Sequence, residues 1–224
     1  MGFIEIGGIT FHEQKGNPKP RMFRSDGSRA LINRMGFNNP GAVKTQSFLN
    51  NYYQRKGRPN VPVWVNLGKS KITENIDAHE DYSKTLDMLW DLADIFVINV
   101  SSPNTPNLRE LQNQDQLRTI LNACMETNKS KAANLNEKEK PILVKIAPDI
   151  SDEQLHGIIA ASMECGCSGI VATNTTVSRP DTNSTKDAKL FTENGGLSGA
   201  PLKDNSTEFI RKIHKITKGK WPIV

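Results

Sequence analysis

Short apolar runs alternate along the chain with segments of helical periodicity. Val, Ile and Phe dominate these runs, and turn residues or charges bound each of them. Such runs are typical of parallel strands that are covered on both faces of a sheet. They predict strands at residues 62–67, 95–100, 142–146 and 169–172. Residues 3–9 predict a further strand, and residues 221–224 predict the beginning of another.

Amphipathic helices are expected between the strands. Apolar residues recur at helical spacing in the segments 82–93, 117–124, 155–159 and 209–216. Ser151 followed by Gln154 predicts a capping box at one helix start, and Gly219 predicts a helix C-cap. Two polar stretches interrupt the alternation of strands and helices. Residues 127–140 predict a surface insertion, and residues 178–192 predict a long loop.

Repeated strand–helix units imply right-handed crossovers and a parallel sheet, and hence an α/β fold. The sheet could be an open, doubly wound one or a (β/α)₈ TIM barrel. Polar residues stand at the ends of successive strands, at Asn66, Asn99, Lys145, Thr173 and Asn174. In a barrel these ends converge on one mouth, whereas in an open sheet they lie along a line. The pattern therefore favours the barrel.

Composition narrows the function classes. The 224 residues suffice for one large domain or two small ones, and no apolar stretch is long enough to span a membrane. A net charge of +5 suits anionic ligands, although a mildly basic solvated surface explains it as well. No basic helix or RNA-binding signature predicts nucleic-acid binding. Cys165 and Cys167 have no second pair or nearby histidine to complete a metal site. We therefore expect no metal and regard the cysteines as structural thiols.

Several segments contain residues that could bind a ligand or take part in catalysis in addition to forming turns. Residues 99–106 leave a buried strand and crowd Asn, Ser and Thr side chains into one loop. Residues 31–39 join amides, a cation and an aromatic ring near Gly36, although on this segment alone a helix that ends at that glycine is the better explanation. Lys145 ends an apolar strand, where a charge needs a carboxylate, a substrate anion or a reduced flavin as partner. Glycines at residues 195–199 allow close approach to a ligand, which is a weak signal alone.

Taken together, these segments resemble the dihydroorotate dehydrogenases. The matching segments keep the family's order and approximate spacing, at residues 16–21, 32–38, 99–106, 145–149, 173–176 and 195–201. Class 1 members carry a cysteine as catalytic base where this chain has Ser102. Serine at that position resembles class 2, whose members pass electrons to membrane quinones.

The resemblance implies an enzyme that oxidises (S)-dihydroorotate to orotate with FMN as hydride acceptor, in pyrimidine biosynthesis. Ser102 would be the base, assisted by Thr105 and by Phe37 closing over it, because a serine hydroxyl alone is a poor base. The resemblance assigns substrate binding to Asn33, Arg34, Met35, Gly36, Phe37, Asn99, Asn104, Asn174 and Thr175. It assigns FMN binding to Gly8, Asn66, Asn99, Lys145, Thr173 and Gly199.

The chain also departs from the family pattern. Gly8 stands where many relatives have threonine near the flavin. A lysine-bearing first strand and the last phosphate-binding strands have no counterpart here, so residues 1–224 are expected to form an incomplete barrel domain, about strands 2 to 6 and the start of strand 7. The resemblance also leads us to expect that the N-terminal region that contacts the membrane in relatives lies outside residues 1–224. The resemblance implies a peripheral membrane protein on the cytoplasmic face of a bacterial membrane, or alternatively on the mitochondrial inner membrane.

Two other functions compete with this interpretation. Another FMN barrel acting on a pyrimidine, such as a dihydropyrimidine dehydrogenase module, would carry cysteine in place of Ser102. A catalytically inactive barrel could serve as a binding or scaffold module. The site residues Ser102, Asn99, Lys145 and Asn174 are all present, which argues against a loss of catalytic activity. Flavin absorbance of the purified protein separates an enzyme from a scaffold.

Overall fold

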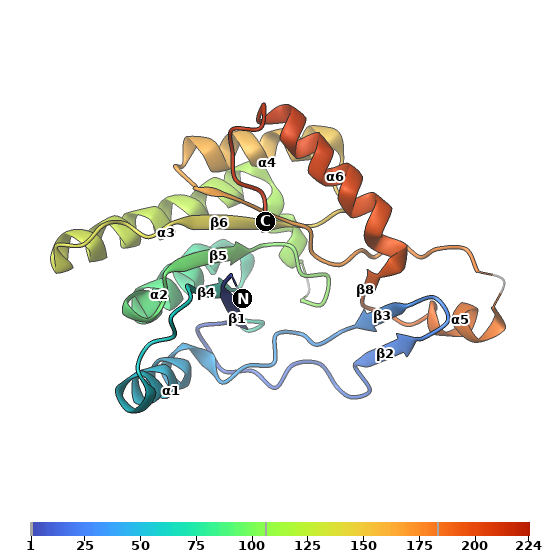
Figure 1. Ribbon diagram of the computed structural model, residues 1–224, viewed down its shortest axis with the longest axis horizontal. Coiled ribbons are helices and arrows are strands. Elements are labelled where there is room, and N and C mark those ends of the chain that lie inside the picture. The colour runs from blue at the N-terminus through green and yellow to red at the C-terminus, as the bar shows by residue number, and fades with distance from the viewer. Residues whose placement is uncertain (1, 106, 183) are drawn as a thin grey trace.

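A five-stranded parallel sheet forms the centre of the computed structural model, which describes residues 2–105, 107–182 and 184–224 (Figure 1). Its strands, in spatial order, are β1 (Ile4–Ile9), β4 (Val63–Leu67), β5 (Ile95–Asn99), β6 (Ile142–Ile146) and β7 (Gly169–Ala172). Every neighbouring pair is parallel. Within this sheet the spatial order of the five strands is also their order along the chain, without the reversal of order that marks a doubly wound sheet. The barrel-wall prediction is therefore confirmed.

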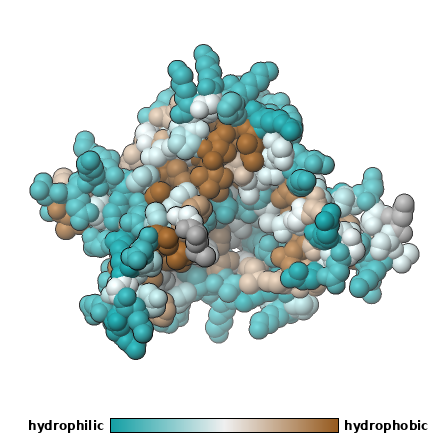
Figure 2. All heavy atoms as spheres, in the orientation of Figure 1, coloured by the Kyte–Doolittle hydropathy of each residue, from teal (hydrophilic) through white to brown (hydrophobic). Residues whose placement is uncertain are grey.

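The C-terminal residues extend this sheet. Ile223 forms a parallel bridge with Ile170, and the Val224 N–H donates to the Ile170 carbonyl at 2.9 Å. The predicted beginning of a further strand at residues 221–224 is thus confirmed. In the view of Figure 2, hydrophobic surface gathers near the centre of the face, around the C-terminal end of the chain, and hydrophilic side chains surround it.

Helices cover the outer face of the sheet. The longer ones are α1 (Gly41–Lys56), α2 (Ala78–Leu89), α3 (Gln114–Leu135), α4 (Asp152–Glu164) and α6 (Lys203–Ile216). Short 3₁₀ helices are η1 (Asn75–Asp77), η2 (Trp90–Leu92), η3 (Leu108–Gln112) and η4 (Ala200–Leu202). One large core joins helix residues such as Leu86 and Ile158 to outer-face strand residues such as Ile98. No helix in the described ranges is long and apolar enough to cross a bilayer.

The inner face of the sheet has two layers. Because side chains alternate between faces along a strand, residues two apart share a face. The first layer is a buried apolar cluster of Trp64, Val97, Leu143 and Val171, against which Phe3 stacks with ring centroids 3.9 Å apart. Two residues further along each chain segment come Asn66, Asn99, Lys145 and Thr173. Strand geometry thus places Asn66, Asn99 and Lys145 in a polar layer on an apolar floor, and Thr173 follows directly after the end of β7.

The predicted helix boundaries are partly right. The capping box at Ser151 is confirmed, with both the Ser151 and Gln154 side chains bonded to backbone N–H groups. Within the expected surface insertion at residues 127–140, α3 continues to Leu135. One of the polar residues in this segment, Asn128, is buried, and it accepts a hydrogen bond from Trp90 Nε1 at 2.8 Å. Gly219 lies beyond the end of α6 with a φ of 67° and donates its N–H to the His214 carbonyl.

A second, antiparallel sheet lies beside the first. It consists of β2 (Met22–Ser25), β3 (Ala30–Asn33) and β8 (Gly196–Gly199), in that order. The alternative of a helix ending at Gly36 is therefore wrong, and the glycine-rich segment is a strand. The expected loop at 178–192 contains α5 (Thr185–Leu190), which docks on the β2–β3 hairpin because Asp187 accepts hydrogen bonds from Ser25 and Ser28. Those two hydroxyl groups hold the pKa of Asp187 below its usual value.

Candidate active site

A chain of amide hydrogen bonds crosses the polar layer. Asn66 Nδ2 donates to Glu5 Oε1 at 2.7 Å, and Asn99 Nδ2 donates to Asn66 Oδ1 at 3.1 Å. Asn174 Nδ2 donates to Asn99 Oδ1 at 3.3 Å. The buried Tyr82 hydroxyl donates to the Asn99 carbonyl and fixes the end of β5 from the helix side. The structure therefore brings together three asparagines that the sequence places far apart.

Lys145 lies in the same layer with a carboxylate partner. Its Nζ is 3.6 Å from Glu5 Oε1, and its side chain is 21% exposed. The expectation that this lysine needs a partner is confirmed. Glu5 itself was missed, although an acidic residue in the apolar strand of residues 3–9 is the kind of signal that marks a functional inner face.

Thr173 has a buried hydroxyl group that the described residues leave without a hydrogen-bond partner. A buried polar group in this state costs free energy unless a ligand completes it. The neighbouring strands β4, β5 and β6 carry the amide groups of Asn66 and Asn99 and the ammonium group of Lys145 at their C-terminal ends. This set of donors and acceptors fits the heterocyclic edge of a flavin lying on the apolar floor.

The loop after β5 carries the candidate base. Ser102 is 7% exposed, and its Oγ accepts a hydrogen bond from the Asn104 backbone N–H at 3.3 Å. Thr105 is buried in the same loop. Pro106, which completes the motif, lies outside the described residues. The loop therefore holds the buried Ser102 hydroxyl group. Two strands, β5 and β3, end in asparagine beside this loop, at Asn99 and Asn33.

The end of the β3 strand meets this loop. Asn104 Nδ2 donates to Asn33 Oδ1 at 3.1 Å. Asn17 Nδ2 donates to the carbonyls of Arg34 and Asn104, at 3.0 and 3.2 Å. Asn17 was not predicted as a site residue, although it falls within a matching segment. These contacts bring Asn33 and Asn104 together next to Ser102.

Phe37 packs its ring between two glycines. A Cβ atom built on Gly8 would lie 2.6 Å from the ring, and one built on Gly68 would lie 2.8 Å from it. Neither position therefore accepts a larger residue while Phe37 keeps this place. The departure at Gly8 has a physical reason here: glycine leaves room for the aromatic ring.

The Arg34 side chain and Gly199 make their contacts outside the amide cluster. Arg34 pairs with Glu193 at 2.6 Å, and its guanidinium group lies 4.5 Å from the centroid of the Phe23 ring. Gly199 pairs with Ala30, at the opposite end of β8 from the Gly196–Asn33 pair. The structure holds the Arg34 side chain on the hairpin and places Gly199 away from Asn33.

Met35 and Gly36 are placed by backbone contacts, and Thr175 by its backbone N–H and by the approach of its hydroxyl group to β8. The Met35 carbonyl accepts from the Asn17 N–H at 3.0 Å, and Gly36 packs against Asn17 with a φ of 70°. The Thr175 N–H donates to Asn174 Oδ1 at 2.8 Å. A Cβ atom on Gly196 would lie 1.9 Å from Thr175 Oγ1, so glycine is required there for Thr175 to approach β8.

The cysteines behave as structural thiols. Cys124 and Cys167 are buried, and burial raises the pKa of the Cys167 thiol to about 12. The described ranges contain no cluster of three or more His, Cys, Asp or Glu side chains that could share a metal ion. The polar layer and the Ser102 loop are thus the chemistry-bearing region to compare with known proteins.

Comparisons with known proteins agree on one family. The family model described as dihydroorotate dehydrogenase matches residues 1–224. Proteins named dihydroorotate dehydrogenase (quinone) from Rhodococcus erythropolis and Thermosynechococcus vestitus are 46% and 47% identical to the whole chain. A crystal structure of DHODH from Eimeria tenella in complex with ferulenol superposes with a TM-score of 0.86 at 36% identity, covering 99% of this chain. The chain spans 59% of the length of those two relatives and 62% of that structure.

Proposed function

This chain belongs to the dihydroorotate dehydrogenase family, and we propose that the protein oxidises (S)-dihydroorotate to orotate, with FMN as the hydride acceptor and a membrane quinone as the final acceptor. One observation carries the proposal. Two amide clusters, Asn99 with Asn174 and Asn33 with Asn104, flank the loop that holds Ser102.

The amide side chains suit the substrate. Dihydroorotate has a carboxylate and a ring with alternating N–H donors and carbonyl acceptors, and asparagine supplies both complementary groups. Asn33, Asn104 and Asn174 would orient the ring, and the Thr175 hydroxyl would add a further contact. Ser102 would take the proton from C5. Because a serine hydroxyl is a weak base at neutral pH, Thr105 would relay the proton while Phe37 limits the access of water.

The polar layer would hold the flavin. FMN supplies hydride acceptance, which amino-acid side chains do not provide. The orphaned Thr173 hydroxyl, Asn66, Asn99 and Lys145 would contact its ring system, with Gly8 nearby and Gly199 toward its phosphate. The Lys145 ammonium would stabilise negative charge that develops beside it during hydride transfer. Glu5 would keep that ammonium oriented toward the layer.

The names of the relatives support a quinone as electron acceptor. Quinones reside in membranes, so we propose a peripheral membrane location, on the cytoplasmic face of a bacterial membrane or alternatively on the mitochondrial inner membrane. The contact would be made by a region outside these 224 residues.

The choice of electron acceptor tests the proposal. In the flavin-loaded protein expressed from its complete gene, ubiquinone or menaquinone analogues are expected to support steady turnover of dihydroorotate, whereas fumarate and NAD are not. The reason is the serine at position 102, which resembles the quinone-linked class. Acceptor-dependent orotate formation measures the preference. Turnover with fumarate or NAD, and none with quinones, would place the protein in class 1 instead.

A further inference from the structure

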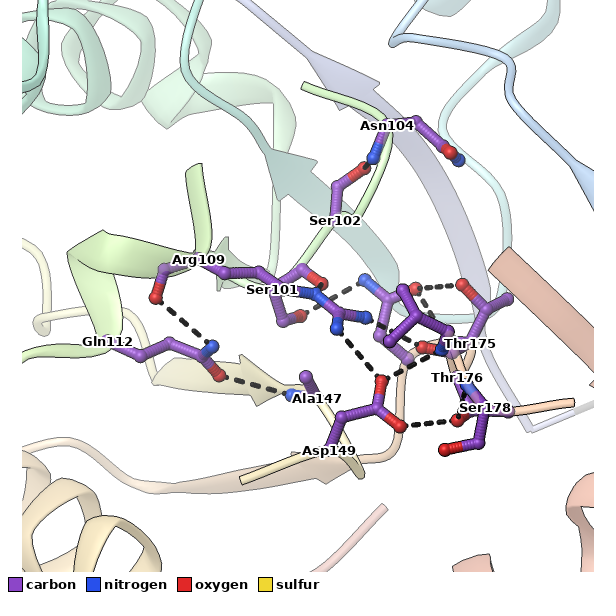
Figure 3. Close-up of polar contacts among 12 residues, drawn as sticks. Ser101, Ser102, Asn104, Arg109, Gln112, Ala147, Asp149, Thr175, Thr176 and Ser178 are labelled. Atoms are coloured by element: carbon purple, nitrogen blue, oxygen red, sulfur yellow. Dashed lines mark hydrogen bonds and ion pairs between the residues drawn. The ribbon is translucent and has the colours of Figure 1, made fainter. Parts of the chain in front are cut away.

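The guanidinium group of Arg109, in η3, reaches three loops that follow neighbouring strands (Figure 3). Its Nη1 donates to Asp149 Oδ2 at 2.8 Å, in the loop after β6. Its Nε donates to the Ser101 carbonyl at 3.2 Å, and its Nη2 donates to the Thr175 carbonyl at 3.0 Å. One planar side chain therefore ties together the loops after β5, β6 and β7.

Asp149 extends this link on its other side. It accepts hydrogen bonds from the Thr176 hydroxyl and from the Val177 N–H. The Arg109 and Asp149 side chains are only 24% and 13% exposed, so water screens their ion pair less than a surface pair. Figure 3 shows Asp149 between Arg109 and Thr176. Gln112 adds a parallel connection, because it accepts from the Ala147 N–H.

The link bears directly on Ser102. Arg109 follows the Ser102 loop in the chain and bonds back to Ser101, so it closes that loop on itself. Ser101 Oγ in turn donates to Asn99 Oδ1 and accepts from Asn174 Nδ2, at 3.1 and 3.0 Å. The path of the loop and the place of Thr175 are thus set by the same guanidinium group.

We propose that Arg109, held by Asp149, is a positioning residue that fixes the Ser102 loop against Asn174 and Thr175. This inference rests on the proposed function, because it takes Ser102 as the base. Arg109 acts through the two carbonyl groups it binds. A displacement of about 1 Å at reacting groups can slow a reaction roughly 10²-fold, so loss of the link affects the rate more than binding.

The variants Arg109→Lys and Arg109→Ala test this role in the flavin-loaded protein. A lysine can still pair with Asp149, but its single nitrogen cannot reach the Ser101 and Thr175 carbonyls as well. We expect both variants to slow flavin reduction by saturating dihydroorotate about 10- to 100-fold. The pH dependence of that step is expected to shift, because the environment of Ser102 changes, while the Michaelis constant changes less. Arg118→Ala is the matched control, since Arg118 pairs with Glu164 between α3 and α4.

Amide hydrogen exchange provides a second readout that does not depend on turnover. Residues 101–105 and 174–177 are expected to exchange faster in both Arg109 variants than in the wild type or in Arg118→Ala. Asp149→Asn should have a similar effect, and combining it with Arg109→Lys should add little, because both act on one link. A wild-type rate and pH profile in Arg109→Lys would overturn the proposal. A slower rate that is fully explained by a lower flavin content of the variant would overturn it as well. Failure of the wild type to oxidise dihydroorotate would instead refute the proposed function, whereas unchanged exchange in Arg109→Lys would refute the link itself.

Discussion

Replacing Ser102 by alanine is expected to slow flavin reduction by dihydroorotate about 10²- to 10⁴-fold, the usual contribution of a general base. Ser102 is buried next to Asn104, and within the described residues its Oγ has one hydrogen bond, from the Asn104 backbone. Alanine removes the hydroxyl and leaves the backbone of the loop in place. Anaerobic rapid mixing of the flavin-loaded protein with dihydroorotate measures this step alone.

Two further variants support the interpretation of this experiment. Ser102→Cys should retain part of the activity and respond to pH differently, because a thiol ionises at much lower pH than a hydroxyl. Ser130→Ala, on the exposed surface of α3, should leave the rate unchanged. A rate close to that of the wild type in Ser102→Ala would show that the base lies elsewhere.

Residues 1–224 expressed by themselves are expected not to retain FMN after gel filtration. The described residues form five parallel strands with the start of another at Ile223, whereas a closed (β/α)₈ barrel needs eight. Barrels of this kind hold the phosphate of a ligand with loops after their last strands and with backbone N–H groups. Flavin absorbance of the monomer fraction, relative to protein, measures retention.

The surface of the chain supports the same expectation. Strand β1 lies at an edge of the sheet, and hydrophobic surface is exposed in Figure 2. Unpaired strand edges and exposed apolar faces favour aggregation. A monomer of these residues that carries an equivalent of FMN and unfolds cooperatively would contradict the prediction. The protein from the complete gene is the matched control, and it is expected to be yellow.

The sequence predicts the barrel wall well because local composition decides it. The apolar runs at residues 142–146 and 169–172 coincide with β6 and β7. Each run is bounded by polar or turn residues. Each is buried against helices whose apolar faces are also predicted by the sequence. Ser151 and Gln154 mark a helix start by side-chain chemistry alone, and the structure confirms both bonds.

The small sheet was not predicted because long-range contacts form it. Strand β3 is four residues long, and it pairs with β8 from a distant part of the chain. Nothing near residues 30–33 signals that partner, and Gly36 suggested a helix end instead. The continuation of α3 was missed for a related reason. The buried Asn128 looks like a surface residue until Trp90 and Lys140 are seen to bond it.

The site residues at strand ends could be predicted from the sequence. The contacts between loops could not. Asn99, Lys145 and Asn174 stand at strand ends in a parallel sheet, so their convergence follows from the fold. Glu5 could have been found from the alternation of faces along β1. Arg109 could not, because its three partners come from three loops whose paths the sequence does not specify.

Anaerobic mixing of the flavin-loaded protein with dihydroorotate tests the central claim most directly. Dihydrouracil, which lacks the carboxylate, is the matched control and also separates this function from that of a dihydropyrimidine dehydrogenase. We predict that dihydroorotate bleaches the flavin absorbance and yields orotate in an amount equal to the flavin reduced, while dihydrouracil does neither. Flavin that stays oxidised with dihydroorotate, or that dihydrouracil reduces as well, would contradict the account.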